Sequence, residues 1–104
     1  MKVVTMCGSM RFNKEMRVIA RNLETKKGWA VIQCIYSQKR DKMDNIEEMH
    51  NIENAHFKKI ELCDCIYVVN KGGYIGEATK RAIAYAKKKG KEIIYHEPVL
   101  EGNK

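Results

Sequence analysis

The sequence lacks several features that would assign it directly to a familiar class of protein. It has 4 cysteines but no C-x-x-C pair, so the ligand spacing that zinc prefers is missing. No apolar run approaches the length of about 18 residues that a membrane span needs, and no charged-then-apolar leader is present. We therefore expect a soluble cytoplasmic protein with reduced, mostly buried thiols, no metal site and no membrane partner.

The common dinucleotide and ATP motifs are missing too. The chain has only 7 glycines, and three of them fall within "NKGGYIGE", residues 70–77. Their spacing matches neither G-x-G-x-x-G nor a Walker loop, and the segment follows the third predicted strand instead of the first. The sequence therefore predicts no NAD or ATP site and no other cofactor.

Acidic residues are outnumbered, since 13 Asp and Glu face 20 Lys and Arg, which gives a net charge of +7. Such a charge suits a phosphorylated or polyanionic partner. The lysines are spread over several predicted helices, and no basic strand is interleaved with aromatic residues. The sequence thus argues against nucleic acid and leaves a small phosphorylated molecule or an ordinary solvated surface.

Apolar runs alternate with amphipathic segments along the whole chain. The predicted strands are "KVVTMC" (2–7), "WAVIQCIY" (29–36), "CIYVVNK" (65–71) and "EIIYHE" (92–97). The predicted helices lie between the Ser9 cap and Gly28, over 46–62, and from Glu77 to the stop at Gly90. The polar segment 37–44 is predicted to be a loop, and residues 99–104 a short tail.

Strands that alternate with helices predict one domain, residues 1–104, folded as a three-layer α/β/α sandwich around a parallel sheet. For so short a chain we expect four strands in the order 2-1-3-4, as in flavodoxin-like and Rossmann-like folds. The near-continuous apolar character of 29–36 predicts an interior or nearly interior strand. Strands one and three then meet at the topological switch point, where ligands bind beyond the carboxyl ends of the strands.

The first segment that emerges there is "CGSMRF". Gly8 and Ser9 precede a predicted helix, whose free backbone N–H groups and positive dipole end favour an anion such as phosphate. Ser9 adds a hydroxyl and Arg11 a charged fork. The alternative is that Ser9 only caps the helix and Gly8 only makes a tight turn.

The second segment is "NKGGYIGE". Gly72, Gly73 and Gly76 allow a positive φ or a close approach of the backbone to a ligand. Glu77 opens the last helix, where the dipole stabilises its ionised form. An ionised carboxylate there serves as a nucleophile, a base or a ligand for hydroxyls, whereas the alternative is a plain acidic residue at a helix start.

Together, "CGSMRF" and "LCDCIYVVNKGGYIGEATKRAIAYAKKKGK" resemble the nucleoside 2-deoxyribosyltransferase-like superfamily over nearly the whole chain. The similarity is closest to small bacterial and phage-type members with "GGYIGE", and more distant to the deoxynucleoside 5′-monophosphate N-glycosidases. The resemblance implies a nucleotide site, with Gly8, Ser9 and Arg11 at the phosphate and Glu77 as the catalytic nucleophile. Glu77 would attack the anomeric carbon and expel the base, and water or a second base would resolve the glycosyl ester.

The chain departs from the characterised enzymes at two positions. His56 stands where those enzymes carry an aspartate, and Thr5 where the monophosphate hydrolases carry a tyrosine. His56 is predicted to bind a sugar hydroxyl or to protonate the leaving base, with a satisfied histidine at a helix edge as the alternative. Asp64 is expected to bind nearby backbone amides.

Several further residues are predicted to line the crevice. Asn70 and Tyr74 face it, although Tyr74 is equally explained as an exposed loop aromatic or a dimer contact. The full set of predicted substrate-binding residues is Gly8, Ser9, Met10, Arg11, Asn70, Gly72, Gly73, Tyr74 and Gly76.

Two functions follow from this reading. The first is cleavage or transfer of the N-glycosidic bond of a nucleoside 5′-monophosphate, because a free nucleoside would give Arg11 little to hold. The second is a non-catalytic nucleotide-binding or sensor module. Related proteins assemble through helices and often complete each other's sites, so we expect a homodimer or a higher homo-oligomer.

Overall fold

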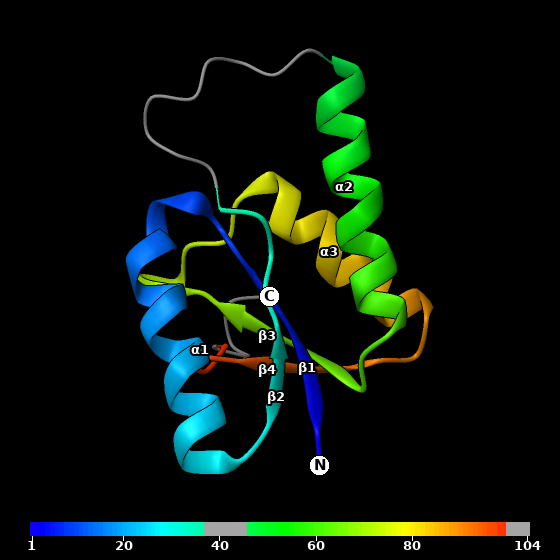
Figure 1. Cartoon of the computed structure of the whole chain (residues 1–104). Coiled ribbons are helices and arrows are strands. Elements are labelled where there is room, and N and C mark those ends of the chain that lie inside the picture. The colour runs from blue at the N-terminus through cyan, green and yellow to red at the C-terminus, as the bar shows by residue number, and fades with distance from the viewer. Residues whose placement is uncertain (37–45, 100–104) are drawn as a thin grey trace.

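The computed structural model describes residues 1–36 and 46–99 of the chain (Figure 1). The predicted loop 37–44 and residues 100–104 of the predicted tail lie outside the described residues. The elements, in chain order, are β1 (Val3–Gly8), η1 (Met10–Phe12), α1 (Asn13–Lys27), β2 (Ala30–Ile32), α2 (Ile46–Glu61), β3 (Cys65–Val69), η2 (Lys71–Gly73), α3 (Glu77–Lys88) and β4 (Glu92–Tyr95).

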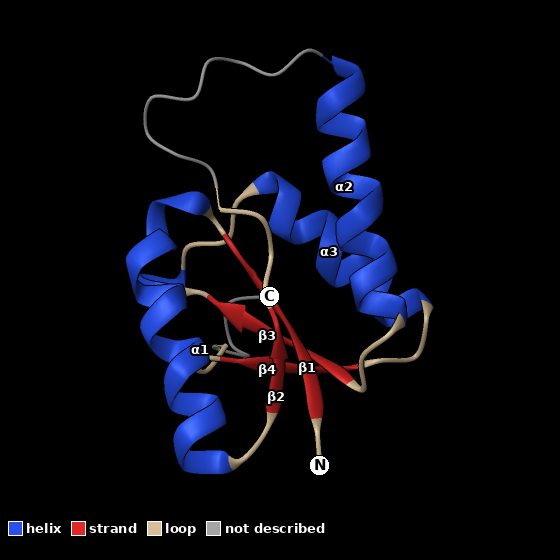
Figure 2. Ribbon diagram, viewed as in Figure 1, coloured by secondary structure: helices blue, strands red, loops and turns tan. Residues whose placement is uncertain are grey.

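The four strands form one parallel sheet in the order β2-β1-β3-β4. Helix α1 covers one face, and α2 and α3 cover the other, so that the sheet is the middle of three layers (Figures 1 and 2). The predicted fold class, strand order and layer arrangement are confirmed. The switch point lies between β1 and β3, the two central strands.

Alternation along the central strands divides the core between the two faces. The side chains of Val4, Met6 and Val69 point toward α1. They pack against Phe12, which directly precedes the helix, and against Met16, Ala20 and Leu23 of the helix itself. Cys7, Ile66 and Val68 point the other way and pack against α2 and α3 through Ile60, Ala82, Ile83 and Ala86. The two faces of the sheet are therefore both buried.

The expectation that strand 29–36 lies in the interior is wrong. Only Ala30–Ile32 are in β2, and this strand lies at the edge of the sheet, paired with β1 alone. Its apolar residues are explained by its two covered faces, since Val31 packs on the α1 side and Ile32 on the α2 and α3 side. A continuous apolar run thus indicates that both faces of a strand are covered. It does not indicate that the strand has a neighbouring strand on each side.

Two other strands end two residues before the predicted boundary. β3 stops at Val69, and the chain turns through η2 at Lys71–Gly73. β4 stops at Tyr95, after which only the N–H of His96 continues the ladder, by donating to the carbonyl of Val68 at 2.8 Å. Both endings place polar residues at the carboxyl edge of the sheet.

The predicted structural role of Asp64 is confirmed. Its Oδ2 accepts a hydrogen bond from the N–H of Val3 at 2.9 Å, and its own N–H donates to the carbonyl of Val3 at 2.9 Å. Asp64 thereby fastens the start of β1 to the start of β3.

The four cysteines are free thiols. Cys7, Cys63 and Cys65 are buried and Cys34 is half-buried, which confirms the prediction of mostly buried thiols. Burial raises the pKa of Cys65 to about 11 and also raises the pKa of Cys7 and Cys34. Within residues 1–36 and 46–99, no helix has both the length and the apolar character to cross a membrane.

Candidate functional site

The two loops singled out in the sequence meet at the carboxyl ends of β1 and β3. The register that pairs Gly8 with Val69 brings both loops out of the sheet at the same level. The guanidinium carbon of Arg11 lies 3.7 Å from the centroid of the Tyr74 ring, which is a cation–π contact. The Phe12 ring meets the same tyrosine edge-on, with 6.2 Å between centroids. The predicted convergence of the loops is confirmed.

Ser9 caps the short helix η1. Its Oγ accepts a hydrogen bond from the N–H of Arg11 at 3.2 Å, and its carbonyl accepts from the N–H of Phe12 at 2.9 Å. Because the hydroxyl acts here as an acceptor, its own hydrogen remains a donor group. Ser9 is therefore a helix cap, and this role leaves its hydroxyl able to donate to an anion.

Packing explains the glycine at position 8. A Cβ there would lie 2.8 Å from Sδ of Met16 and 3.3 Å from the carbonyl oxygen of Val69. The absent side chain lets α1 lie close to the end of β3. Met10, in the adjacent turn, is partly buried against the same core. Gly8 and Met10 thus have structural roles whether or not a ligand binds.

Backbone conformation explains two glycines of the glycine-rich segment, residues 70–76. Gly72 has φ of 64° and Gly73 of 82°, which is the left-handed region. A Cβ on either residue would meet no atom within 4 Å, so crowding within the chain is not the reason for glycine. These two residues turn the chain from β3 toward α3.

Gly76 is different, because its φ of −79° is open to any residue. It is the N-cap of α3 and supplies no side-chain hydrogen bond to the first turn. A Cβ built on it would lie 3.9 Å from Cβ of Ser9. The uncapped N-terminus of α3 therefore opens beside Ser9, and this is the arrangement that favours an anion.

Glu77 is the first residue of α3 and stands in the open. Its side chain is 82% exposed, and Oε2 lies 3.4 Å from Nζ of Lys80 in a surface ion pair. Such exposed pairs hold a side chain only weakly. The carboxylate is thus free to turn toward a ligand that lies over Gly76.

Asn70 has a structural role instead of the predicted ligand contact. The residue is 2% exposed, its Nδ2 donates to the carbonyl of Glu97 at 2.9 Å, and its Oδ1 accepts from the N–H of Glu97 at 2.8 Å. Both ends of the amide are therefore bound inside the protein. Burial and these two bonds direct the side chain away from the crevice.

Glu97 is a residue of this region that the sequence analysis did not single out. Its Oε1 accepts a hydrogen bond from the N–H of Gly72 at 3.1 Å. Strand order 2-1-3-4 already predicts that the residues after β4 lie beside those after β3. Glu97 could have been found from this predicted neighbourhood. It was not singled out because "HEP" has the polar character of an ordinary exposed segment.

His56 lies against the sheet, on the side that α2 and α3 cover. Its Nε2 is 3.3 Å from Sγ of Cys7 at the end of β1. Desolvation, and then the charge of Lys59, lower the pKa of the imidazole, while Glu53 raises it to a smaller extent. The ring is therefore neutral at neutral pH, and this favours the satisfied histidine over an acid that protonates a leaving base.

The contacts between α2 and α3 also separate His56 from Glu77. Glu53 binds Arg81 at 2.6 Å and Phe57 stacks on Tyr85 with 4.4 Å between centroids. These contacts align the middle of α2 with the second and third turns of α3, whereas Glu77 opens the first. His56 and Glu77 are thus carried by different parts of the helix pair.

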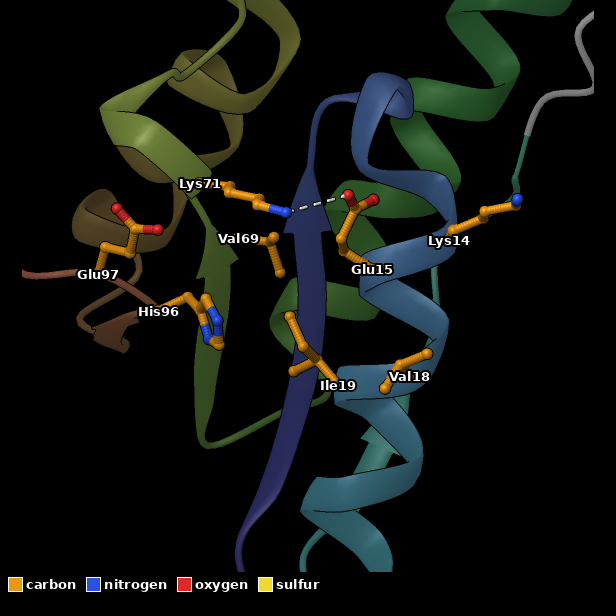
Figure 3. A pocket seen from close by; sticks show the side chains of 8 residues that line it. All are labelled: Lys14, Glu15, Val18, Ile19, Val69, Lys71, His96 and Glu97. Carbon is orange, nitrogen blue, oxygen red and sulfur yellow. Dashed lines mark hydrogen bonds and ion pairs between the residues drawn. The ribbon is translucent and has the colours of Figure 1, made fainter.

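A hollow of about 380 Å³ lies next to the glycine-rich segment, on the face of the sheet that α1 covers (Figure 3). Val69 and Ile19 form its apolar floor, and an ion pair between Lys71 and Glu15, at 3.4 Å, crosses one end. Its remaining lining residues are Lys14, Val18, His96 and Glu97. The sequence analysis did not predict this hollow.

Fold and geometry together define a class: a doubly wound α/β protein with an open, cationic candidate site at its switch point. Among residues 1–36 and 46–99, no three or more His, Cys, Asp and Glu side chains gather in a way that could hold a metal ion. The structure brings together Ser9, Arg11, Tyr74 and Gly76 from the predicted set.

The chain matches no family model and no curated protein. Among solved structures, it is similar to homoserine dehydrogenase of S. aureus, with 12% sequence identity and a TM-score of 0.37. That alignment covers 97% of this chain but only 33% of the dehydrogenase, so the chain spans about a third of that enzyme's length.

Proposed function

We propose that the chain binds a nucleoside 5′-monophosphate at the switch point and cleaves or transfers its N-glycosidic bond, with Glu77 as the nucleophile. The observation that carries the proposal is the meeting of Arg11, Tyr74 and the uncapped start of α3. A guanidinium, a serine hydroxyl and free backbone N–H groups suit a phosphate. The sequence resemblance of the same two loops supports the nucleotide assignment.

In this proposal, phosphate binding positions the sugar for reaction. The phosphate lies among Ser9, Arg11 and the first N–H groups of α3, and the sugar lies toward Glu77. The carboxylate attacks the anomeric carbon as the bond to the base breaks, and the base leaves with the bonding electrons and takes up a proton from solvent. Water then hydrolyses the glycosyl ester and releases the carboxylate, or a second base displaces it.

The second candidate function is nucleotide binding without catalysis, and one observation favours it. Glu77 is 82% exposed, whereas a glycosyl ester intermediate calls for a site that excludes bulk water. Glu77 would then only bind sugar hydroxyls. A partner subunit that covers Glu77 would remove this objection.

The surface that supports a homodimer is on α2. Ile46, Met49 and Ile52 are 71%, 46% and 42% exposed, and their spacing puts them along one side of the helix. These residues lie in the N-terminal half of α2, which spans Ile46–Glu61. Two copies of α2 that pair antiparallel about Met49 would cover the apolar residues of both.

Base release from a panel of ribo- and deoxyribonucleoside monophosphates tests the catalytic proposal. The parent is expected to free one base, detected by chromatography, and Glu77→Gln to lose at least about 100-fold of that activity. Glu92→Gln, an exposed glutamate at the amino end of β4, is the matched control and should keep full activity. Equal release by Glu77→Gln and the parent would exclude Glu77 as the nucleophile.

Nucleotide binding is measured separately with Arg11→Ala and its matched control Arg17→Ala. Arg17 also makes a cation–π contact with a tyrosine, Tyr36, at 4.7 Å from the ring centroid, but it lies on α1 and not on η1. Calorimetry should show at least about 10-fold weaker binding for Arg11→Ala only. Binding without base release would establish the second function, and the absence of any binding to the parent would exclude both.

A further inference from the structure

The glycine-rich segment is held from one side by a single residue, Glu97. Three hydrogen bonds connect them: two between the Asn70 amide and the backbone of Glu97, at 2.9 and 2.8 Å, and one from the N–H of Gly72 to Glu97 Oε1, at 3.1 Å. The backbone pair fixes where Glu97 lies. Its carboxylate then reaches the turn itself.

Packing does little to hold this turn. Lys71, Gly72 and Gly73 are exposed, and a Cβ on either glycine would meet nothing within 4 Å. The ion pair between Lys71 and Glu15, at 3.4 Å, is exposed and therefore weak. Left-handed glycines also have more freedom than other residues to take another conformation. Hydrogen bonds thus select the observed conformation of the turn.

The turn determines where Tyr74 lies. The N–H of Tyr74 donates to the carbonyl of Lys71 at 3.2 Å, so the ring follows directly from the conformation of Gly72 and Gly73. Tyr74 in turn carries the 3.7 Å contact with Arg11. A rotation of the turn would therefore separate the two halves of the candidate site.

We propose that Glu97 is a positioning residue, which holds the glycine-rich segment so that Tyr74 and the start of α3 face Arg11 and Ser9. The inference concerns the geometry of the site and deepens the proposed function, on which its consequence for a ligand rests. Glu97 itself does not touch the reacting atoms. It acts through the N–H of Gly72.

Amide hydrogen exchange, followed by NMR, tests the positioning role without any ligand. In Glu97→Ala, the N–H of Gly72 should exchange at least about 10-fold faster than in the parent, while the N–H groups within β3 keep their protection. Glu97→Gln retains an acceptor oxygen and should stay close to the parent. Glu92→Ala, at the other end of β4, is the matched control and should leave Gly72 unchanged.

Two results would overturn the inference. One is unchanged exchange at Gly72 in Glu97→Ala. The other is faster exchange throughout the sheet, which would make Glu97 a residue of general stability. Neither result depends on whether a nucleotide binds, so failure of the proposed function is distinguished from failure of this inference.

A kinetic measurement then connects the two proposals. If nucleotides are cleaved, Glu97→Ala should lower kcat/KM at least about 10-fold, because the segment that leads to Glu77 and to the first N–H groups of α3 has moved. Part of that loss should be a lower kcat, since Glu77 is displaced from the sugar. An unchanged kcat would contradict positioning of the reacting groups.

Discussion

At the scale of single residues, the contact between Cys7 and His56 is informative because neither side chain is charged. Burial raises the pKa of the thiol and desolvation lowers the pKa of the imidazole. With 3.3 Å between Sγ and Nε2, the two groups share a hydrogen bond between neutral partners. The pair suits a core contact better than it suits acid catalysis.

This contact predicts a pH dependence of stability. The pKa of His56 is lower in the folded protein than its unfolded value of about 6.5, so the unfolded chain binds more protons once the pH falls through that value. The free energy of unfolding should therefore decrease as the pH falls below about 6.5. Above that pH, His56 is neutral in both states and does not make stability depend on pH.

Urea unfolding at pH 8 and pH 5.5 checks the prediction. His56→Gln should show a smaller loss of stability between the two pH values than the parent. His50→Gln, an exposed histidine on the same helix, should behave like the parent. The same pH dependence in His56→Gln and the parent would contradict the lowered pKa.

At the scale of elements, the N-terminus of α3 has no side-chain cap. Gly76 takes a φ of −79° that serine or aspartate also adopts, and a Cβ there would meet nothing closer than 3.6 Å. A better cap was therefore sterically available. Its absence leaves the first N–H groups of the helix free for an anion.

The Gly76→Asp variant should thus be more stable than the parent and bind the nucleotide more weakly. A capping carboxylate and a less flexible unfolded chain together add up to about 1 kcal/mol to the free energy of unfolding. The same carboxylate repels a phosphate and occupies its donors, so the nucleotide Kd should rise at least about 10-fold. Gly76→Ser, which has no charge, separates the two effects, and chemical unfolding and calorimetry measure them. Unchanged Kd in Gly76→Asp would exclude this helix start as the anion site.

The arrangement of strands and helices shows what could be predicted from the sequence. All four strands, the three main helices and the strand order follow from the alternation of apolar and amphipathic segments, and the meeting of the two loops follows from the order. That order already places strand two at the edge of the sheet, but the short length of β2 could not be predicted, because an apolar run looks the same whether one neighbour or two are present. The roles of Asn70 and His56 depend on which partner each finds, Glu97 or Cys7, and spacing does not encode that choice.

At the scale of the whole molecule, the N-terminal part of α2 extends beyond the sheet (Figure 1). Its apolar residues Ile46, Met49 and Ile52 are exposed. If two copies pair through this helix, Met49→Glu should convert a dimer to a monomer in sedimentation equilibrium at micromolar concentration. Val18→Glu replaces an apolar side chain that is 59% exposed on α1, and it should leave the dimer intact. A monomeric parent would contradict the proposed homodimer.

The bond between Val3 and Asp64 has a consequence for synthesis of the chain. These residues are 61 positions apart, and they start the pairing of the two central strands. At ribosomal rates of about 5–20 residues per second, β1 waits roughly 3–12 s before β3 has been made. During that interval its apolar residues have no partner strand on that side, so this edge of the nascent chain stays exposed to non-native contacts.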